Sequence, residues 1–166
     1  MAQGIHVTVA AIIERAGQFL LVEEESDGRT VLNQPAGHLE RDESLIDAVI
    51  RETLEETGHR FEPHALVGFY LWKSESAGVT FLRVTFCGTA VPPAKSTRLD
   101  DGIVGFHWLT ADEIRRRAHQ LRSPMVLRGI DDYLAGIRYP LACLTYIPST
   151  ISDITDTPLD ASSSRN

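Results

Sequence analysis

The chain has 166 residues, of which 43% are hydrophobic and 23% charged, and its formal net charge is -7. This length suits one domain with a substantial core and is short for two. A nucleic-acid polymer is a poor partner for an acidic chain, because binding a phosphate backbone needs an excess of Lys and Arg. Small phosphorylated substrates remain compatible, since a bound divalent cation can invert the local field.

The sequence indicates neither export nor membrane insertion. Cys87 and Cys143 lack the spacing of a zinc site or a redox motif, which fits a reducing cytoplasm. The N-terminal apolar run is brief, is interrupted by Glu14 and Arg15, and follows no basic segment. We therefore expect a cytoplasmic protein without a signal peptide or a transmembrane span.

The first part of the chain predicts strands. Residues 6–13 are rich in β-branched side chains and indicate a strand buried on both faces. Residues 18–25 follow a turn and predict a second strand, and residues 30–35 predict a short extended segment that ends at a proline. Together these segments predict a meander.

A helix comes next, and its ends are marked. Ser44 with Asp47 predicts a capping box, and Gly58 is placed to end the helix in the left-handed conformation. After it, residues 64–73 and 79–91 predict two strands of a long hairpin.

The remaining elements are a strand and two helices. Residues 103–109 predict the strand, Thr110 can cap a helix over residues 111–121, and Pro124 can begin another that runs to about residue 135. The order of strands, helix, strands and helices favours an α+β fold with a mixed sheet. We expect residues 1–147 to form the domain and residues 148–166, rich in Ser, Thr and Asp, to be a disordered tail.

The helix between residues 44 and 58 has clustered acids. Glu52, Glu55 and Glu56 fall within an arc of roughly 100° and so share a face. A different side is formed by residues at steps of three and four that can pack on a sheet, namely Ile46, Val49, Ile50, Thr53 and Thr57. Mg²⁺ prefers oxygen ligands, so three carboxylates on one anchored helix can hold a cation. The alternative is a solvated acidic face on which Arg51 pairs with Asp47 or Glu55.

The segment before the helix favours the metal site. The stretch "NQPAGHLERDE" leads into the helix through a proline and a glycine. Gly37 has no Cβ, so its backbone carbonyl can approach a cation closely. Five residues separate Gly37 from Glu43, and seven separate Glu43 from Arg51.

This arrangement resembles the Nudix box, in which a Gly and a Glu precede an Arg-Glu-hydrophobic-x-Glu-Glu-x-Gly-hydrophobic run. The matching residues are Gly37, Glu43, Arg51, Glu52, Glu55, Glu56 and Gly58. Two positions depart from the pattern, because Thr53 and His59 stand where it prefers hydrophobic residues. Ala36 stands where many members have a second Gly.

The resemblance implies the Nudix fold, a mixed sheet in an α/β/α sandwich, and hydrolysis of a nucleoside diphosphate linked to another group. It implies Mg²⁺ or Mn²⁺ as cofactor, held by Glu52, Glu55 and Glu56 with the carbonyl of Gly37. It also implies that Arg51 and Glu43 orient this site. Either Glu55 or Glu56 can accept the proton of the attacking water.

Several stretches also resemble the NudJ-type phosphatase branch of the family. They are "HVTVAAII", "NQPAGHLE", "FLRVTF", and "LRSP" followed by "RYPL", within about residues 6–141. This resemblance implies a phosphatase that releases phosphate from nucleoside tri- and diphosphates. It also implies activity on hydroxymethylpyrimidine diphosphate and thiamine diphosphate.

Residues beyond the box are candidates for the organic end of the substrate. Tyr70, Trp72 and Arg83 lie on the hairpin strands, where an aromatic ring and a guanidinium can stack on a base. The alternative is that alternate residues of these strands fill the core, and we expect this of Phe81. His38, beside the metal loop, can touch phosphate.

The loop acids Asp100 and Asp101 allow two interpretations. Some Nudix members use a further acid from a loop after the box, and either residue could supply it. They are equally compatible with a turn before Gly102, which we favour.

Two other functions are compatible with the sequence. The chain could be a Nudix pyrophosphohydrolase of another nucleoside diphosphate derivative, or a nucleotide-binding Nudix domain that does not cleave. A Nudix enzyme that processes RNA fits poorly with the net acidity. We expect small phosphorylated substrates, no nucleic-acid polymer and no membrane partner, and either a monomer or a homodimer.

Overall fold

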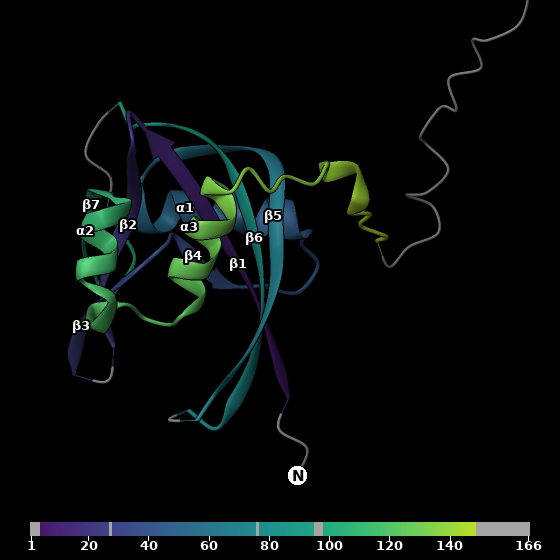
Figure 1. The fold of residues 1–166 in the computed structure, drawn as a ribbon. Coiled ribbons are helices and arrows are strands. Elements are labelled where there is room, and N and C mark those ends of the chain that lie inside the picture. Colours follow the sequence, from purple (N-terminus) through teal and green to yellow (C-terminus); the bar gives the residue numbers. More distant parts are fainter. Residues whose placement is uncertain (1–3, 27, 76, 95–97, 149–166) are drawn as a thin grey trace, which may run out of the picture.

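The computed structural model describes residues 4–26, 28–75, 77–94 and 98–148 (Figure 1). The expected tail falls almost wholly on residues 149–166, which lie outside the described residues. The strands are β1 (Ile5–Arg15), β2 (Gln18–Ser26), β3 (Arg29–Asn33), β4 (Ala36–His38), β5 (Arg60–Ser74), β6 (Val79–Val91) and β7 (Ile103–Thr110). The helices are α1 (Leu45–Thr57), α2 (Ala111–Arg116) and α3 (Met125–Leu134), with 3-10 turns at Ala118–Gln120 and Leu141–Cys143.

The strands form a mixed sheet around β1. The strand order is β3-β2-β1-β6-β5, with β4 paired to β1 and β7 paired to β2. β1 runs parallel to β6 and antiparallel to β2 and β4. The predicted α+β class with a mixed sheet is therefore confirmed.

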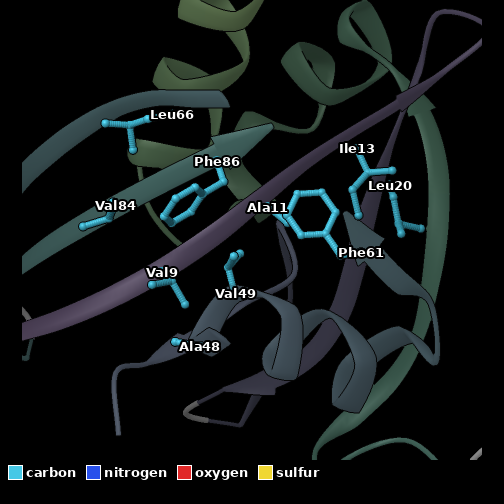
Figure 2. Packing of buried hydrophobic residues seen from close by; sticks show 10 residues of the cluster. All are labelled: Val9, Ala11, Ile13, Leu20, Ala48, Val49, Phe61, Leu66, Val84 and Phe86. Carbon is cyan, nitrogen blue, oxygen red and sulfur yellow. The ribbon is translucent and has the colours of Figure 1, made fainter. Parts of the chain in front are cut away.

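Helices cover both faces of the sheet, because the central strands bury both of their faces. Along β1, Val9, Ala11 and Ile13 belong to the hydrophobic cluster under α1, whereas Ile12 belongs to the cluster under α2 and α3. Figure 2 shows the first cluster, in which Phe86 of β6 lies among side chains from β1, β2, β5 and α1. In Figure 1, α3 lies in front of the sheet and α1 behind it. This is the predicted sandwich.

Three local features differ from the sequence-based predictions. β4 was not predicted, because three residues are too few to show a strand periodicity. The helix expected over residues 111–121 ends at Arg116 and continues as a 3-10 turn. β5 begins at Arg60, before the predicted start, and its register shifts beside Pro63, which has no N–H to donate to the ladder.

No helix among the described residues is long and apolar enough to cross a membrane.

Replacing Phe86, which is 0% exposed, by alanine should lower the free energy of unfolding by about 3–5 kcal/mol. The ring fills the centre of the α1-side cluster, and its removal leaves a cavity. Urea denaturation measures the effect. Leu71→Ala is the control, since Leu71 is 69% exposed and should change stability by less than about 0.5 kcal/mol. Equal effects of the two substitutions would contradict this description of the core.

Candidate active site

The ends of α1 follow from local hydrogen bonds. The Ser44 hydroxyl accepts from the backbone N–H of Asp47 at 3.1 Å, as predicted for the N-cap. The Asp47 carboxylate accepts from the Ser44 hydroxyl at 2.6 Å, so the expected reciprocal bond to the Ser44 backbone is replaced by a side-chain bond. At the other end, Gly58 has φ 70° and its N–H donates to the Leu54 carbonyl. The helix is thus held at both ends.

The acidic residues of α1 are not all on a solvated face. Glu52 is 9% exposed and Glu56 is 6% exposed, whereas the side chain of Glu55 is 39% exposed. Our expectation that the carboxylates and the packing residues occupy different sides is therefore wrong for Glu52 and Glu56. These two face β4, which α1 contacts, and Ile46 and Ile50 are only partly buried.

The departures from the box consensus do not disturb the helix. Thr53 is buried, and its hydroxyl donates to the Val49 carbonyl at 2.8 Å. His59 is also buried, and its ring packs edge-on against Phe106 at a centroid distance of 5.2 Å. Both side chains therefore occupy apolar surroundings with their polar atoms hydrogen-bonded.

Gly37 lies on β4 directly against the acids of α1. A Cβ at this position would overlap the Glu52 carboxylate. The neighbouring Ala36 donates its backbone N–H to the Glu56 carboxylate at 2.8 Å. A glycine here lets the Glu52 carboxylate approach the strand closely, and its backbone is not left-handed.

Arg51 lies at the centre of the exposed part of the acidic cluster. Its guanidinium donates to both oxygens of Glu43, at 2.7 and 3.0 Å. The same side chain donates to Glu52 at 2.8 Å, to Glu55 at 2.9 Å, and to the carbonyl of His38 at 3.1 Å. The structure thus brings together Arg51 and Glu43, the pair expected to orient the site.

The acids differ in how well their charge is compensated. Burial raises the pKa of Glu56 to about 9, the Ala36 N–H lowers it, and the charges of Glu24, Glu52 and Asp100 raise it further. Burial also raises the pKa of Glu52, against the lowering effect of Arg51. Arg51 instead holds the pKa of Glu43 below its ordinary value. Glu56 is therefore a buried carboxyl that lacks a cationic partner within hydrogen-bonding distance.

The cluster has the donor chemistry of a divalent-metal site but not its final arrangement. Among the described residues, no three His, Cys, Asp or Glu side chains converge on one point that could hold a metal ion. The hydrogen bonds explain this, because Arg51 engages Glu52 and Glu55 while Glu56 turns to the Ala36 N–H. The residues present nevertheless fit Mg²⁺, since their oxygens are hard ligands and the buried charge needs a cation.

The structure separates the two candidate loop acids. Asp100 lies beside α1, where its backbone N–H donates to the Glu55 carbonyl at 3.1 Å. Asp101 is exposed, and its carboxylate pairs with Arg98 at 3.3 Å. Of the two residues, Asp100 is therefore the one placed near the glutamates.

A cavity of about 570 Å³ opens on the other side of β4. Residues of all six strands β1 to β6 line it, together with residues of the segment 119–125, which leads to the first residue of α3. Trp72 and Phe81, which are paired across β5 and β6, stack at a centroid distance of 5.8 Å and contribute to its lining. Phe81 is therefore part of the cavity and not of the core, contrary to our expectation. The volume is within the usual range for small-molecule sites.

Polar side chains line the inner part of the cavity. Arg83 is 5% exposed and donates to the side-chain oxygens of Asn33 and Gln34, each at 3.3 Å. Burial lowers its pKa to about 10, against the charges of Glu24 and Glu56. Glu24 of β2 also lines the cavity, and burial raises its pKa.

Sequence reasoning found Arg83 but missed Glu24, Asn33 and Arg122. Two of these three missed residues lie in stretches that the sequence analysis had singled out. Asn33 belongs to "NQPAGHLE" and Arg122 to "LRSP", the stretches that resemble the NudJ-type branch. Glu24 gave no such signal, because it stands within a run of three glutamates.

The other candidate substrate residues fall in different places. His38 lines the cavity, and its Nε2 lies 3.2 Å from Nδ1 of His6. Burial lowers the pKa of His38, and His6 and Arg122 lower it further. Tyr70 is not part of the lining, because its hydroxyl donates to Asp132 of α3 at 2.9 Å.

Comparison with known proteins identifies the family of the chain. The NUDIX domain model matches residues 4–128. Phosphatase NudJ of Escherichia coli strain K12 is 40% identical over 136 residues, which cover 82% of this chain and 88% of that protein. A NUDIX hydrolase from Nitrosomonas europaea, known as a solved structure, is 49% identical with a TM-score of 0.86 and covers 89% of this chain and 100% of that chain. The E. coli ORF135 protein, at 19% identity and a TM-score of 0.64, covers 81% of this chain and 91% of that chain and shows the fold alone.

The family model matches most of the chain. The matched region includes the capped helix with its buried carboxylates, the strand that contains Gly37, and the adjacent cavity. The chain belongs to the Nudix family. It is a Nudix hydrolase, and within the family it resembles the phosphatase NudJ.

Gly37→Ala should reduce kcat/KM of the hydrolysis by about 10²-fold, because the added Cβ would overlap the Glu52 carboxylate and force it to move. The matched control is Gly105→Ala on β7, where a Cβ would meet nothing within 4 Å. Steady-state kinetics with a titration of Mg²⁺ measures both variants. Full activity of Gly37→Ala would contradict the close packing described here.

The stability of the metal-free protein should fall as pH rises between about pH 5 and about pH 9. Unfolded Glu56 releases its proton near its ordinary pKa of 4.5, whereas the folded carboxyl keeps it until about pH 9. The folded state therefore binds more protons in this window, and raising the pH destabilises it. Urea denaturation across the window should show a shallower fall for Glu56→Gln. The exposed control Glu62→Gln should behave like the parent protein, and an unchanged slope in Glu56→Gln would refute the assignment.

Proposed function

We propose that this Nudix hydrolase is a Mg²⁺-dependent phosphatase, with Mn²⁺ as an alternative cofactor. Its proposed substrates are nucleoside tri- and diphosphates, hydroxymethylpyrimidine diphosphate and thiamine diphosphate, from which it releases phosphate. The observation that supports this most directly is the buried, undercompensated acid Glu56, which lies one strand away from a cavity with an aromatic wall.

The proposed metal ligands are the carboxylates of Glu52, Glu55 and Glu56 with the carbonyl of Gly37. Nudix enzymes generally use a divalent metal, and when bound it neutralises the diphosphate and lowers the pKa of a coordinated water. Glu52 and Glu55 share Arg51 in the structure, so taking up a cation requires Arg51 to give up these contacts. Arg51 keeps its bidentate contact with Glu43, which is the proposed anchor for its guanidinium.

One glutamate of this set accepts the proton of the attacking water. Glu55 and Glu56 are the candidates, and they differ in surroundings. Glu55 is more exposed and hydrogen-bonded to Arg51, whereas Glu56 is buried and accepts from a backbone N–H. A base needs to be ionised at working pH, and a bound cation would favour the ionised form of either residue.

The cavity is the proposed site for the organic end of the substrate. Trp72 supplies an aromatic surface on which a heterocycle can stack, and Arg83 supplies positive charge at the buried end. His38 lies at the edge next to Gly37, where the phosphate chain would pass from the cavity to the glutamates. These positions favour a small phosphorylated substrate as the partner.

Glu55→Gln and Glu56→Gln should each reduce kcat/KM by about 10²-fold or more, because each removes a charged oxygen from the metal set. The measurement is product release from a panel of nucleoside di- and triphosphates, hydroxymethylpyrimidine diphosphate and thiamine diphosphate with Mg²⁺. Glu62→Gln, an exposed acid on β5, is the matched control and should retain parental activity.

The same assay distinguishes the alternatives. Orthophosphate as the sole phosphate product of a triphosphate supports the phosphatase. Pyrophosphate, or cleavage only of a different nucleoside diphosphate derivative, would instead favour a pyrophosphohydrolase. Activity that persists in the presence of a chelator, or in both glutamate variants, would contradict the proposed metal-binding roles.

A further inference from the structure

The cavity contains buried polar atoms that the protein itself does not satisfy. Among the described residues, Oγ1 of Thr8, Nε of Arg83 and Oγ of Ser123 are buried without a hydrogen-bond partner. All three residues line the cavity, and they are 6%, 5% and 5% exposed. Leaving such groups unpaired is costly, so small side-chain movements that expose them to the cavity would let a polar ligand satisfy them.

The chemistry of these groups constrains what the ligand offers. Nε of Arg83 can only donate a hydrogen bond, and the two hydroxyls can donate or accept. The ligand edge that meets them must therefore contain acceptors. Glu24 has the opposite character, because an ionised carboxylate only accepts.

The carboxylate of Glu24 can accept further hydrogen bonds. Its side chain is 18% exposed, and its partners are Nδ2 of Asn33 at 3.4 Å and Nε of Arg122 at 3.7 Å. Both distances are at or beyond the long end of a hydrogen bond. A ligand donor placed at the Glu24 carboxylate would therefore meet unoccupied lone pairs.

The aromatic wall specifies the shape of the ligand. The rings of Trp72 and Phe81 are inclined by only 19° and lie on the same hairpin. A planar heterocycle can lie along such a surface with its polar edge towards the interior. The ligand is then a flat ring whose edge has both a donor and acceptors.

We propose, resting on the proposed function, that Glu24 is a specificity-determining residue that accepts a hydrogen bond from the exocyclic amino group of the substrate's base. The site then favours an amino-substituted ring over its keto counterpart. A keto oxygen would place an acceptor against a carboxylate, and a site built around one hydrogen bond strongly rejects an analogue that cannot form it.

Asn33 and Arg122 share this part of the cavity with Glu24. Asn33 directs its amide oxygen to Arg83 and its amide nitrogen to Glu24, so both ends of its side chain are engaged. Arg122 lies on the Glu24 side of the cavity at ion-pair distance. Of Glu24, Asn33 and Arg122, the ionised Glu24 carboxylate is the group that only accepts hydrogen bonds, so the preference for an amino group is assigned to it.

Matched pairs of nucleotides test this directly. Cytidine and uridine nucleotides differ by an amino or a keto group at one ring position, and so do adenosine and inosine nucleotides. The dissociation constants of the α,β-methylene diphosphate analogues are measured with Mg²⁺ by calorimetry, and kcat/KM is measured for the triphosphates. In the parent protein the amino member of each pair should bind about tenfold more tightly or better.

Glu24→Gln should bring this ratio close to one, because an amide can rotate to donate to a keto oxygen as well as accept from an amino group. Glu25→Gln, the same change at the adjacent exposed residue, should keep the parental ratio. Equal affinities in the parent, absence of binding in both pairs, or a preference that survives Glu24→Gln would overturn the proposal. Binding with the expected preference but without hydrolysis would contradict the proposed function and leave this inference standing.

Discussion

The burial of Glu52 and Glu56 against β4 is the constraint on which the site depends. Carboxylates are taken out of water only where other groups compensate their charge. The Ala36 N–H does so only in part for Glu56, and Arg51 only in part for Glu52, since burial keeps the pKa of both carboxyls raised. Gly37 makes the arrangement sterically possible, because any side chain at its position would occupy the space of the Glu52 carboxylate.

The same three-residue strand also separates the acidic cluster from the cavity. β4 has α1 on one side, and its residues Ala36, Gly37 and His38 line the cavity on the other. Arg83 is influenced by both, since the charges of Glu24 in the cavity and Glu56 on the helix oppose the lowering of its pKa by burial. A substrate with a ring in the cavity and phosphates at β4 would therefore meet one continuous electrostatic environment.

Local signals predicted most elements and the acidic half of the site. Alternation and β-branched residues predicted β1, the cap at Ser44 and the glycine at 58 bounded α1, and the strand of residues 79–91 was predicted with its exact limits. The cavity half was predicted less well. Period two places Tyr70 and Trp72 on the same face of their strand, but it does not show whether that face meets a helix or a cavity. In the structure, Tyr70 donates a hydrogen bond to α3, and Phe81 lines the cavity.

The sequence by itself determined the helix, its caps, the spacing from Gly37 to Gly58 and hence the family, because all of these depend on residues close together along the chain. Only the tertiary structure decided that Glu52 and Glu56 are buried, that Asp100 rather than Asp101 approaches them, and that Glu24 shares a cavity with Arg83. Glu24 and Arg83 come from strands on opposite sides of β1. Their proximity follows from the antiparallel and parallel pairings of distant segments, which no local periodicity encodes.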